Sequence, residues 1–382
     1  MGASLELVLP GPGGPPRLRR LPTLLCGGLL LAVAIGFSWR GAGEPGPLSV
    51  PEPERTLALL VGRTLDLDDA LDRAPAWERR LHELTVTEGA GDLGQAIAWY
   101  EELAGSSDDP AVEVQLAVLE LGTLVASVAV LALGIGRLRR RPAALAVGTA
   151  AIPPPWPGGI GVAVLVRGGA AGLGLAAAAG LLLAHLEVDH PLVDALMMPA
   201  ASLPLIFLAR RHLVAAGQGL WRGLGLWPPS GGLRRLAAAA ALLVAAGTLA
   251  DLLVGFVGQW AGHAAHWTEW FDRDLAWGTP LEAASSVVGG VVLAPFVEEV
   301  AFRGLLYATL RRRLDWLAAA LLSAALFALP HGYGLGGSLS VFVSGLVWAW
   351  GYERTGSLLP GIAAHAANNL WASFVVLDVF RA

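Results

Sequence analysis

Two adjacent carboxylates and an arginine lie inside an apolar stretch of this chain. Glu298 and Glu299 follow Ala-Pro-Phe-Val, and Arg303 comes one helical turn later. Insertion of an ionisable side chain near the centre of a bilayer costs at least about 2.5–3.5 kcal/mol, so such residues usually have a function. The spacing of four predicts that Glu299 and Arg303 share a helix face and form an ion pair. Glu298, about 100° away around the helix axis, keeps a free carboxylate in a dry interior, where it can act as a general base.

Two histidines and an asparagine follow in later apolar segments. His331 ends the run Phe327-Ala-Leu-Pro-His, where a proline and a glycine-rich stretch break the helix. His365 and Asn369 are four residues apart, so they share one face of the last helix. A buried base, a histidine that can share its proton and two side chains that can hydrogen-bond to an oxyanion indicate a hydrolytic site. Inside a membrane, the expected substrate is a peptide bond.

The composition places the chain in a membrane. Of its 382 residues, 55% are hydrophobic and only 15% are charged, whereas roughly 25% of the residues in soluble domains are charged. The mean hydropathy is +0.59, and the net charge of −5 gives no indication of nucleic-acid binding. The single cysteine, Cys26, cannot form an internal disulfide. All 26 basic residues are arginine, which excludes a Ser-Lys dyad, a Walker lysine and a pyridoxal Schiff base.

The apolar segments predict an all-α, polytopic transmembrane helical bundle of about eight or nine spans with a small helical extramembrane insert. We expect an N-terminal anchor at 21–39 and spans at 114–136, 161–183, 192–209, 236–256, 281–310, 314–330, 339–350 and 358–380. The predicted organisation is an N-terminal tail with a membrane anchor or signal peptide (1–39), an acidic extracytoplasmic helical insert (40–112), transmembrane helices (113–257), a tryptophan-rich outer loop (258–280) and the core that carries the ionisable residues (281–382). Asp109 and Pro110 predict the start of a helix, with Asp109 as the N-cap and Pro110 at the first helical position.

Arginine clusters predict the orientation of these spans. The clusters at 17–20, 137–141, 210–235 and 311–313 fall on one side of the predicted bundle, and such loops remain in the cytoplasm. The acidic insert and the tryptophan-rich loop then lie on the opposite face. We expect a multi-pass integral membrane protein. Its arginine-only, Ala/Gly-rich composition is typical of bacteria with GC-rich genomes, so the bacterial cytoplasmic (inner) membrane is the expected location.

The depth of the polar residues can be estimated from the arginine-bearing ends. At about 1.5 Å per helical residue, Glu298 lies ~20 Å, His331 ~27 Å and His365 ~16 Å along their helices. In a hydrocarbon core about 30 Å thick, these positions bracket the middle. Polar residues of three separate helices are therefore predicted to converge.

These residues resemble the motifs of the CPBP family of intramembrane proteases, which includes CAAX prenyl endopeptidases and bacterial proteins known as Abi. Three family motifs, Glu-Glu-x-x-x-Arg, Phe-x-x-x-His and His-x-x-x-Asn/Asp, occur in order and are matched by Glu298, Glu299, Arg303, Phe327, His331, His365 and Asn369. The resemblance covers residues 281–380 and does not extend to the insert.

The resemblance implies a role for each side chain. Glu298 and His331 would activate the attacking water, and His365 and Asn369 would stabilise the tetrahedral oxyanion. The Glu299–Arg303 pair would hold the helix and the first glutamate in place. This mechanism requires no cofactor. In the alternative, Glu298, His331 and His365 would bind zinc, since three protein ligands and a water are a common catalytic zinc arrangement.

Structural roles compete with these assignments. The Glu299–Arg303 pair serves a purely structural purpose equally well, and His365 with Asn369 can act as a polar contact between helices. A catalytically inactive scaffold or a transporter-like protein would use the same buried charges to bind partner helices. Transporters usually show paired halves with broken helices, whereas the ionisable residues here are confined to the last four spans. We therefore expect an intramembrane endopeptidase that takes a peptide or membrane-protein substrate from the lipid bilayer.

Overall fold

The computed structural model describes residues 21–30, 110–140, 145–186, 190–213, 219–226, 232–261, 272, 274–275 and 279–381. The predicted insert up to residue 109, and most of the tryptophan-rich loop, lie outside these residues. Within the described ranges all regular structure is helical, which confirms the predicted all-α class. Its long helices are α5 (Pro110–Arg140), α6 (Gly158–His185), α7 (Pro191–Leu213) and α9 (Gly232–Ala261), with the short α8 (Leu220–Gly223) between the last two.

The helix that carries both glutamates runs unbroken from Pro280 to Leu310. It consists of α11 (Pro280–Val287), the π-helical η5 (Val288–Leu293), α12 (Ala294–Glu298), the π-helical η6 (Glu299–Tyr307) and α13 (Ala308–Leu310). Thr279 and Glu282 form a capping box at its start, and Pro280 occupies the first helical position, as a helix N-terminus favours. π-helical turns are rare and frequently mark functional sites. The two glutamates lie where α12 passes into the second π segment.

Three further helices complete the core. They are α14 (Trp316–Ala328), α15 (Leu335–Thr355) and α16 (Leu359–Arg381), with a 3₁₀ turn, η7 (Leu329–His331), directly after α14. Asp315 caps α14 by accepting the Ala318 N–H at 2.9 Å. After η7 the chain turns at Gly332, whose φ of 67° favours glycine. This turn is the break that the proline and glycines predicted.

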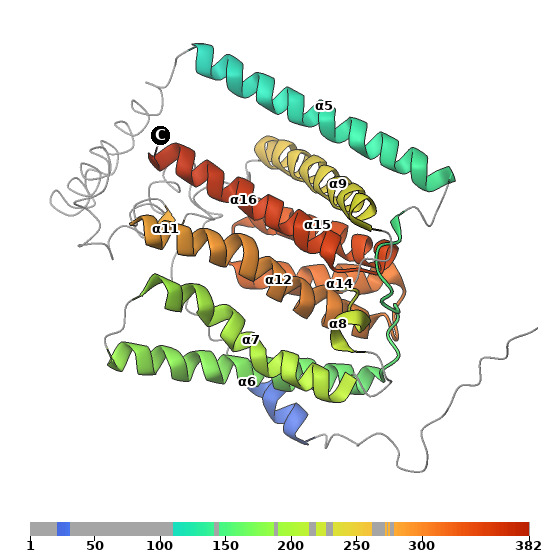
Figure 1. The fold of residues 1–382 in the computed structure, drawn as a ribbon, viewed down its shortest axis with the longest axis vertical. Helices are drawn as coiled ribbons and strands as arrows, with labels where there is room; N and C mark the ends of the chain where they lie inside the picture. Colours follow the sequence, from blue (N-terminus) through green and yellow to red (C-terminus); the bar gives the residue numbers. More distant parts are fainter. Residues whose placement is uncertain are drawn as a thin grey trace, which may run out of the picture.

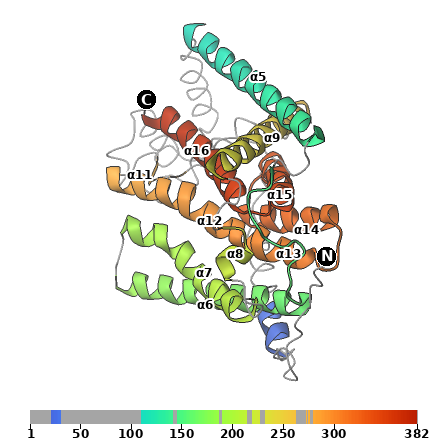
Figure 2. The ribbon, with the colours of Figure 1, turned by 45° about the vertical axis from the view of Figure 1, so that its right-hand side comes forward.

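The helices stack in layers (Figures 1 and 2). α5 lies at one edge against α9, and α9 packs on α15 and α16. Next come the α11–α13 helix and α14, and α7 with α6 forms the opposite edge. The helix Leu21–Leu30, which is the described part of the predicted anchor, contacts α6 through a 3.0 Å hydrogen bond from Arg167 Nε to Thr23 Oγ1. α15 and α16 are therefore interior helices of the stack.

Five helices in the described ranges are long and apolar enough to cross a membrane, namely Leu121–Arg140, Gly158–His185, Pro191–Leu213, Gly232–Ala261 and Pro280–Leu310. The chain is an integral membrane protein of the helical-bundle class. Each span predicted from residue 114 onward coincides with a helix, although the boundaries differ. α5 begins at Pro110, α9 extends to Ala261, and α15 is 21 residues long, longer than the predicted 339–350.

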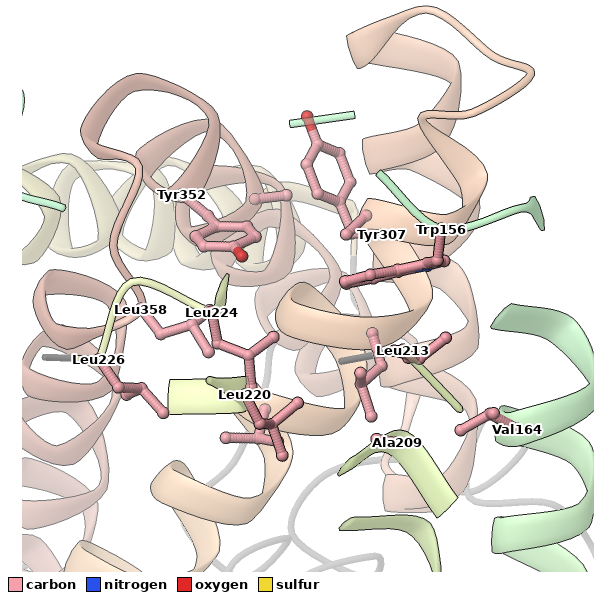
Figure 3. Close-up of a cluster of buried hydrophobic side chains, with 14 of the residues drawn as sticks. Trp156, Val164, Ala209, Leu213, Leu220, Leu224, Leu226, Tyr307, Tyr352 and Leu358 are labelled. Carbon is pink, nitrogen blue, oxygen red and sulfur yellow. The ribbon is translucent and has the colours of Figure 1, made fainter. Parts of the chain in front are cut away.

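The main hydrophobic core lies at the arginine-bearing end of the bundle. Its buried side chains come from α6, α7, α8, η6, α14 and α15 and from the connections next to them. They include Trp156, Val164, Ala209, Leu213, Leu220, Leu224, Leu226, Tyr307, Tyr352 and Leu358 (Figure 3). Polar contacts also hold this end together. The N–H groups of Val147 and Gly148 each donate to Thr355 O at 2.9 Å, and Arg311 Nη2 lies 2.8 Å from Glu353 Oε1. The core helices thus extend into the membrane from a well-packed base.

Candidate active site

The Glu299–Arg303 pair forms the buried centre of the site. Arg303 Nη1 lies 2.9 Å from Glu299 Oε1, and both side chains are only 1% exposed. Glycines on two neighbouring helices leave room for the pair. A Cβ at Gly345 of α15 would lie 3.1 Å from Arg303 Nη2, and a Cβ at Gly361 of α16 would lie 3.2 Å from Glu299 Oε2. The three helices can approach this closely because these positions carry no side chain.

His365 of α16 lies between the two glutamates. Its Nδ1 is 3.3 Å from Glu299 Oε1, and its Nε2 is 3.6 Å from Glu298 Oε2. Because the arginine-paired carboxylate of Glu299 acts as an acceptor, we place a proton on Nδ1. The Glu298 side chain is 19% exposed and that of Glu299 is 1% exposed. Glu298 is therefore the carboxylate that a water or a substrate can reach.

His331 is held by the end of α14. Its Nδ1 lies 2.9 Å from the carbonyl oxygen of Phe327, which can only accept, so Nδ1 carries the proton. In the neutral imidazole this leaves the Nε2 lone pair free to accept a hydrogen bond. The contact gives the histidine a backbone partner at a helix end. It fixes the tautomer without using the nitrogen that could serve as a base.

Asn369 connects α16 to the first π segment. Its Nδ2 donates to the Gly290 carbonyl oxygen at 2.8 Å. An amide NH₂ has two N–H groups, so one remains for a further acceptor. The neighbouring Asn368 is exposed. Asn369 is thus oriented by the π-helical segment that precedes the glutamates.

Two aromatic rings enclose the charged groups. The Cζ atom of Arg303 lies 4.2 Å from the centre of the Phe327 ring and 5.1 Å from that of Trp348. The Trp348 indole stacks on His365 at 4.1 Å between centroids and an interplanar angle of 19°. Phe327 contacts His365 at 5.8 Å and His331 at 4.9 Å. Sequence reasoning missed Trp348, because a tryptophan in an apolar helix carries no signal that separates it from lipid-facing or packing aromatics.

A further acid, the half-buried Asp251, has a hydrogen-bond partner that the sequence did not reveal. Asp251 of α9 accepts a hydrogen bond from the hydroxyl of Ser340 on α15. A carboxylate within an apolar helix requires such a partner. The two residues are 89 positions apart, so no local spacing could connect them. This contact joins α9 to a core helix.

The zinc alternative can be tested against the positions of its predicted ligands. Glu298 lies next to His365. His331 lies on the other contact of the Phe327 ring, which touches both histidines. Among the side chains that the structure describes, no three or more His, Cys, Asp or Glu residues are grouped so that they could hold a metal ion.

Comparison with known proteins finds a family whose model matches this region. Residues 280–371 match the family described as "Type II CAAX prenyl endopeptidase Rce1-like". The comparisons with curated proteins and with solved structures returned no match. The matched region contains both glutamates, the arginine, both histidines and the asparagine. This family supports an intramembrane endopeptidase in general. Over residues 280–371 the chain therefore matches the CAAX protease family, which is the CPBP family that its motifs predicted.

Proposed function

We propose that this protein is an intramembrane endopeptidase in which Glu298 activates the attacking water. The observation that carries the proposal is the position of the Glu298 carboxylate, which is partly exposed and 3.6 Å from a histidine that a buried ion pair orients. With His365 protonated on both nitrogens, two carboxylates and two cations sum to zero charge. A neutral set of charges avoids the large cost of placing an unpaired ion in a medium of low dielectric constant.

These side chains can carry out each step of peptide-bond hydrolysis. Glu298 accepts a proton from water, the water oxygen bonds to the peptide carbonyl carbon, and the C=O π electrons move onto oxygen. The resemblance gives His331 a share in activating the water, and its Nε2 lone pair is available to accept a hydrogen bond. His365 Nε2–H and the second N–H of Asn369 donate to the oxyanion. When the C–N bond breaks, Glu298 returns its proton to the leaving nitrogen, and one water has been added.

The proposed substrate is a peptide or membrane-protein segment that reaches Glu298 from the bilayer. The family name refers to prenylated CAAX substrates, and the resemblance also includes bacterial proteins that act on targets without a prenyl group. A bacterial inner membrane would supply the second kind. We therefore propose an unprenylated membrane-associated substrate, with the Glu298–His331 pair as the base and no metal requirement.

Terminal proteomics in the native cell tests this function. Membrane and secreted peptide termini would be compared between cells that carry the wild-type protein and cells that carry Glu298→Gln. Glu282→Gln is the matched control, because it makes the same change at the other end of the same helix and glutamine also supports a capping box. We expect a set of termini that Glu298→Gln removes and Glu282→Gln retains. No difference between the three strains, with all proteins inserted at equal abundance, would contradict proteolysis and favour the scaffold.

A further inference from the structure

The imidazole of His365 is constrained on its edges and on its face by different residues. Glu299 and Glu298 lie at its two nitrogens, and Trp348 covers its face in a near-parallel stack at 4.1 Å and 19°. Rotation of the imidazole about its Cβ–Cγ bond would break this stack and move both nitrogens away from the carboxylates. The indole therefore fixes the plane in which His365 can contact both glutamates.

The same indole also borders the Arg303 guanidinium. Arg303 has one ion-pair contact, to Glu299, and its Nε and Nη2 find no hydrogen-bond acceptor among the described residues. Its guanidinium lies instead between two aromatic faces, with Cζ 4.2 Å from Phe327 and 5.1 Å from Trp348. Aromatic faces attract a desolvated guanidinium. Trp348 thus contacts both partners of the glutamates, the His365 imidazole and the Arg303 guanidinium.

We propose that Trp348 is a positioning residue for the proposed endopeptidase reaction. It holds the His365 imidazole and the Arg303 guanidinium in place beside the two glutamates. The inference rests on the proposed function and adds to it a residue outside the three motifs. Trp348 is only 4% exposed, so substrate does not reach it. Its effect is therefore on the chemical step and not on substrate binding.

The test uses full-length protein in lipid nanodiscs and a fluorogenic peptide that spans a terminus lost in Glu298→Gln cells. Trp348→Leu removes the aromatic face, and Trp348→Phe keeps one. Trp316→Leu is the matched control, because it makes the same change at an exposed tryptophan at the start of α14, which belongs to neither the charged site nor the aromatic cluster around Phe327. If Trp348→Leu does not insert, Trp348→Met replaces it.

We expect Trp348→Leu to lower kcat roughly 10- to 100-fold, because a misplacement of about 1 Å can cost about 100-fold in rate. KM should stay near its wild-type value, since a residue that acts only in the transition state changes kcat alone. Trp348→Phe should retain most of the rate, and Trp316→Leu should match the wild type.

Three results would overturn the proposal while leaving the endopeptidase function intact. They are an unchanged kcat in Trp348→Leu, a rise confined to KM, or an equal loss of rate in Trp316→Leu. A different result, the absence of any terminus that depends on Glu298, would contradict the endopeptidase function itself and the positioning role with it.

Discussion

At the scale of single residues, Arg303 shows how the site accommodates charge. Its side chain is completely buried beside an equally buried carboxylate. A buried ion pair adds little net stability compared with apolar packing, but removal of one partner leaves an uncompensated charge. The intact pair therefore contributes little to the free energy of unfolding, but removal of one partner is strongly destabilising. This holds whether or not the pair also supports catalysis.

Arg303→Gln should lower the free energy of unfolding by about 3–5 kcal/mol, because Glu299 would lose its cation in a dry interior. Thermal unfolding of the purified protein in detergent measures the change. Arg313→Gln, at an exposed arginine after the same helix, should have little effect. Equal midpoints for the two variants would show that the buried pair is not essential to the fold.

The two adjacent asparagines of α16 provide a matched pair for the proposed oxyanion contact. Asn369→Ala should lower kcat by about 100- to 1,000-fold, as the loss of one oxyanion donor does in other hydrolases. Asn368→Ala should leave kcat unchanged, because that side chain is exposed. Cleavage of the same fluorogenic peptide measures both. A wild-type kcat in Asn369→Ala would contradict the oxyanion contact. The role of Asn369 would then be limited to its hydrogen bond to Gly290.

Spacing along one helix predicted the residue contacts that are local. The four-residue separation of Glu299 and Arg303 was sufficient to predict their ion pair. The estimate of similar depth was sufficient to expect His365 near the glutamates. The contacts of Trp348 and Ser340 could not be predicted, because they depend on how helices are rotated and placed around one another, which apolar periodicity in a uniformly apolar segment does not define.

At the scale of elements, the α6–α7 pair depends on close backbone approach. A Cβ at Gly172 of α6 would lie 2.2 Å from the Ala201 carbonyl oxygen of α7, and one at Gly168 would lie 2.6 Å from Leu205 Cα. Small residues four apart let transmembrane helices pack backbone to backbone. These glycines therefore set the distance between the two helices that form one edge of the stack.

Gly172→Ala should separate α6 from α7 and destabilise the protein by about 1–3 kcal/mol, the usual cost of overpacking. Gly174→Ala is the control, because nothing lies within 4 Å of a Cβ there. In that open position alanine should be neutral or stabilising, since it is the better helix former. Thermal unfolding midpoints compare the two. A Gly172→Ala midpoint at or above that of Gly174→Ala would contradict the close packing.

The predicted spans located the helices, but their internal geometry was not predictable. The run 280–310 reads as one ordinary helix, whereas the structure places two π-helical segments around α12. A π turn changes the rotation of every following residue relative to the preceding turn. The orientation of the glutamates relative to α16 therefore required the structure.

At the scale of the whole molecule, the arginine-bearing helix ends gather on one side. The last turns of α5 and α7 and the first turn of α9 carry arginines, and these ends lie together with the α13–α14 connection (Figure 1). This is the arrangement that the alternation of arginine clusters predicted. It supports an orientation with this end in the cytoplasm.

Reporter fusions test that orientation. A fluorescent reporter fused after residue 215 should be active in the cytoplasm, and alkaline phosphatase fused after residue 100, in the acidic insert, should be active outside it. The physical reason is that arginine-rich segments resist translocation. A cytoplasmic signal from the insert fusion would contradict the predicted topology.

The central claim is that the Glu298 carboxylate performs peptide hydrolysis without a metal. Its most direct test is the cleavage rate of the fluorogenic peptide by wild-type protein and Glu298→Gln in nanodiscs, each after dialysis against a zinc chelator. We predict that the wild-type rate survives dialysis and that the rate of Glu298→Gln falls by about 100-fold or more, as loss of a general base does. A Glu298→Gln rate equal to the wild type would contradict the account. So would a wild-type rate that is lost on dialysis and restored by zinc.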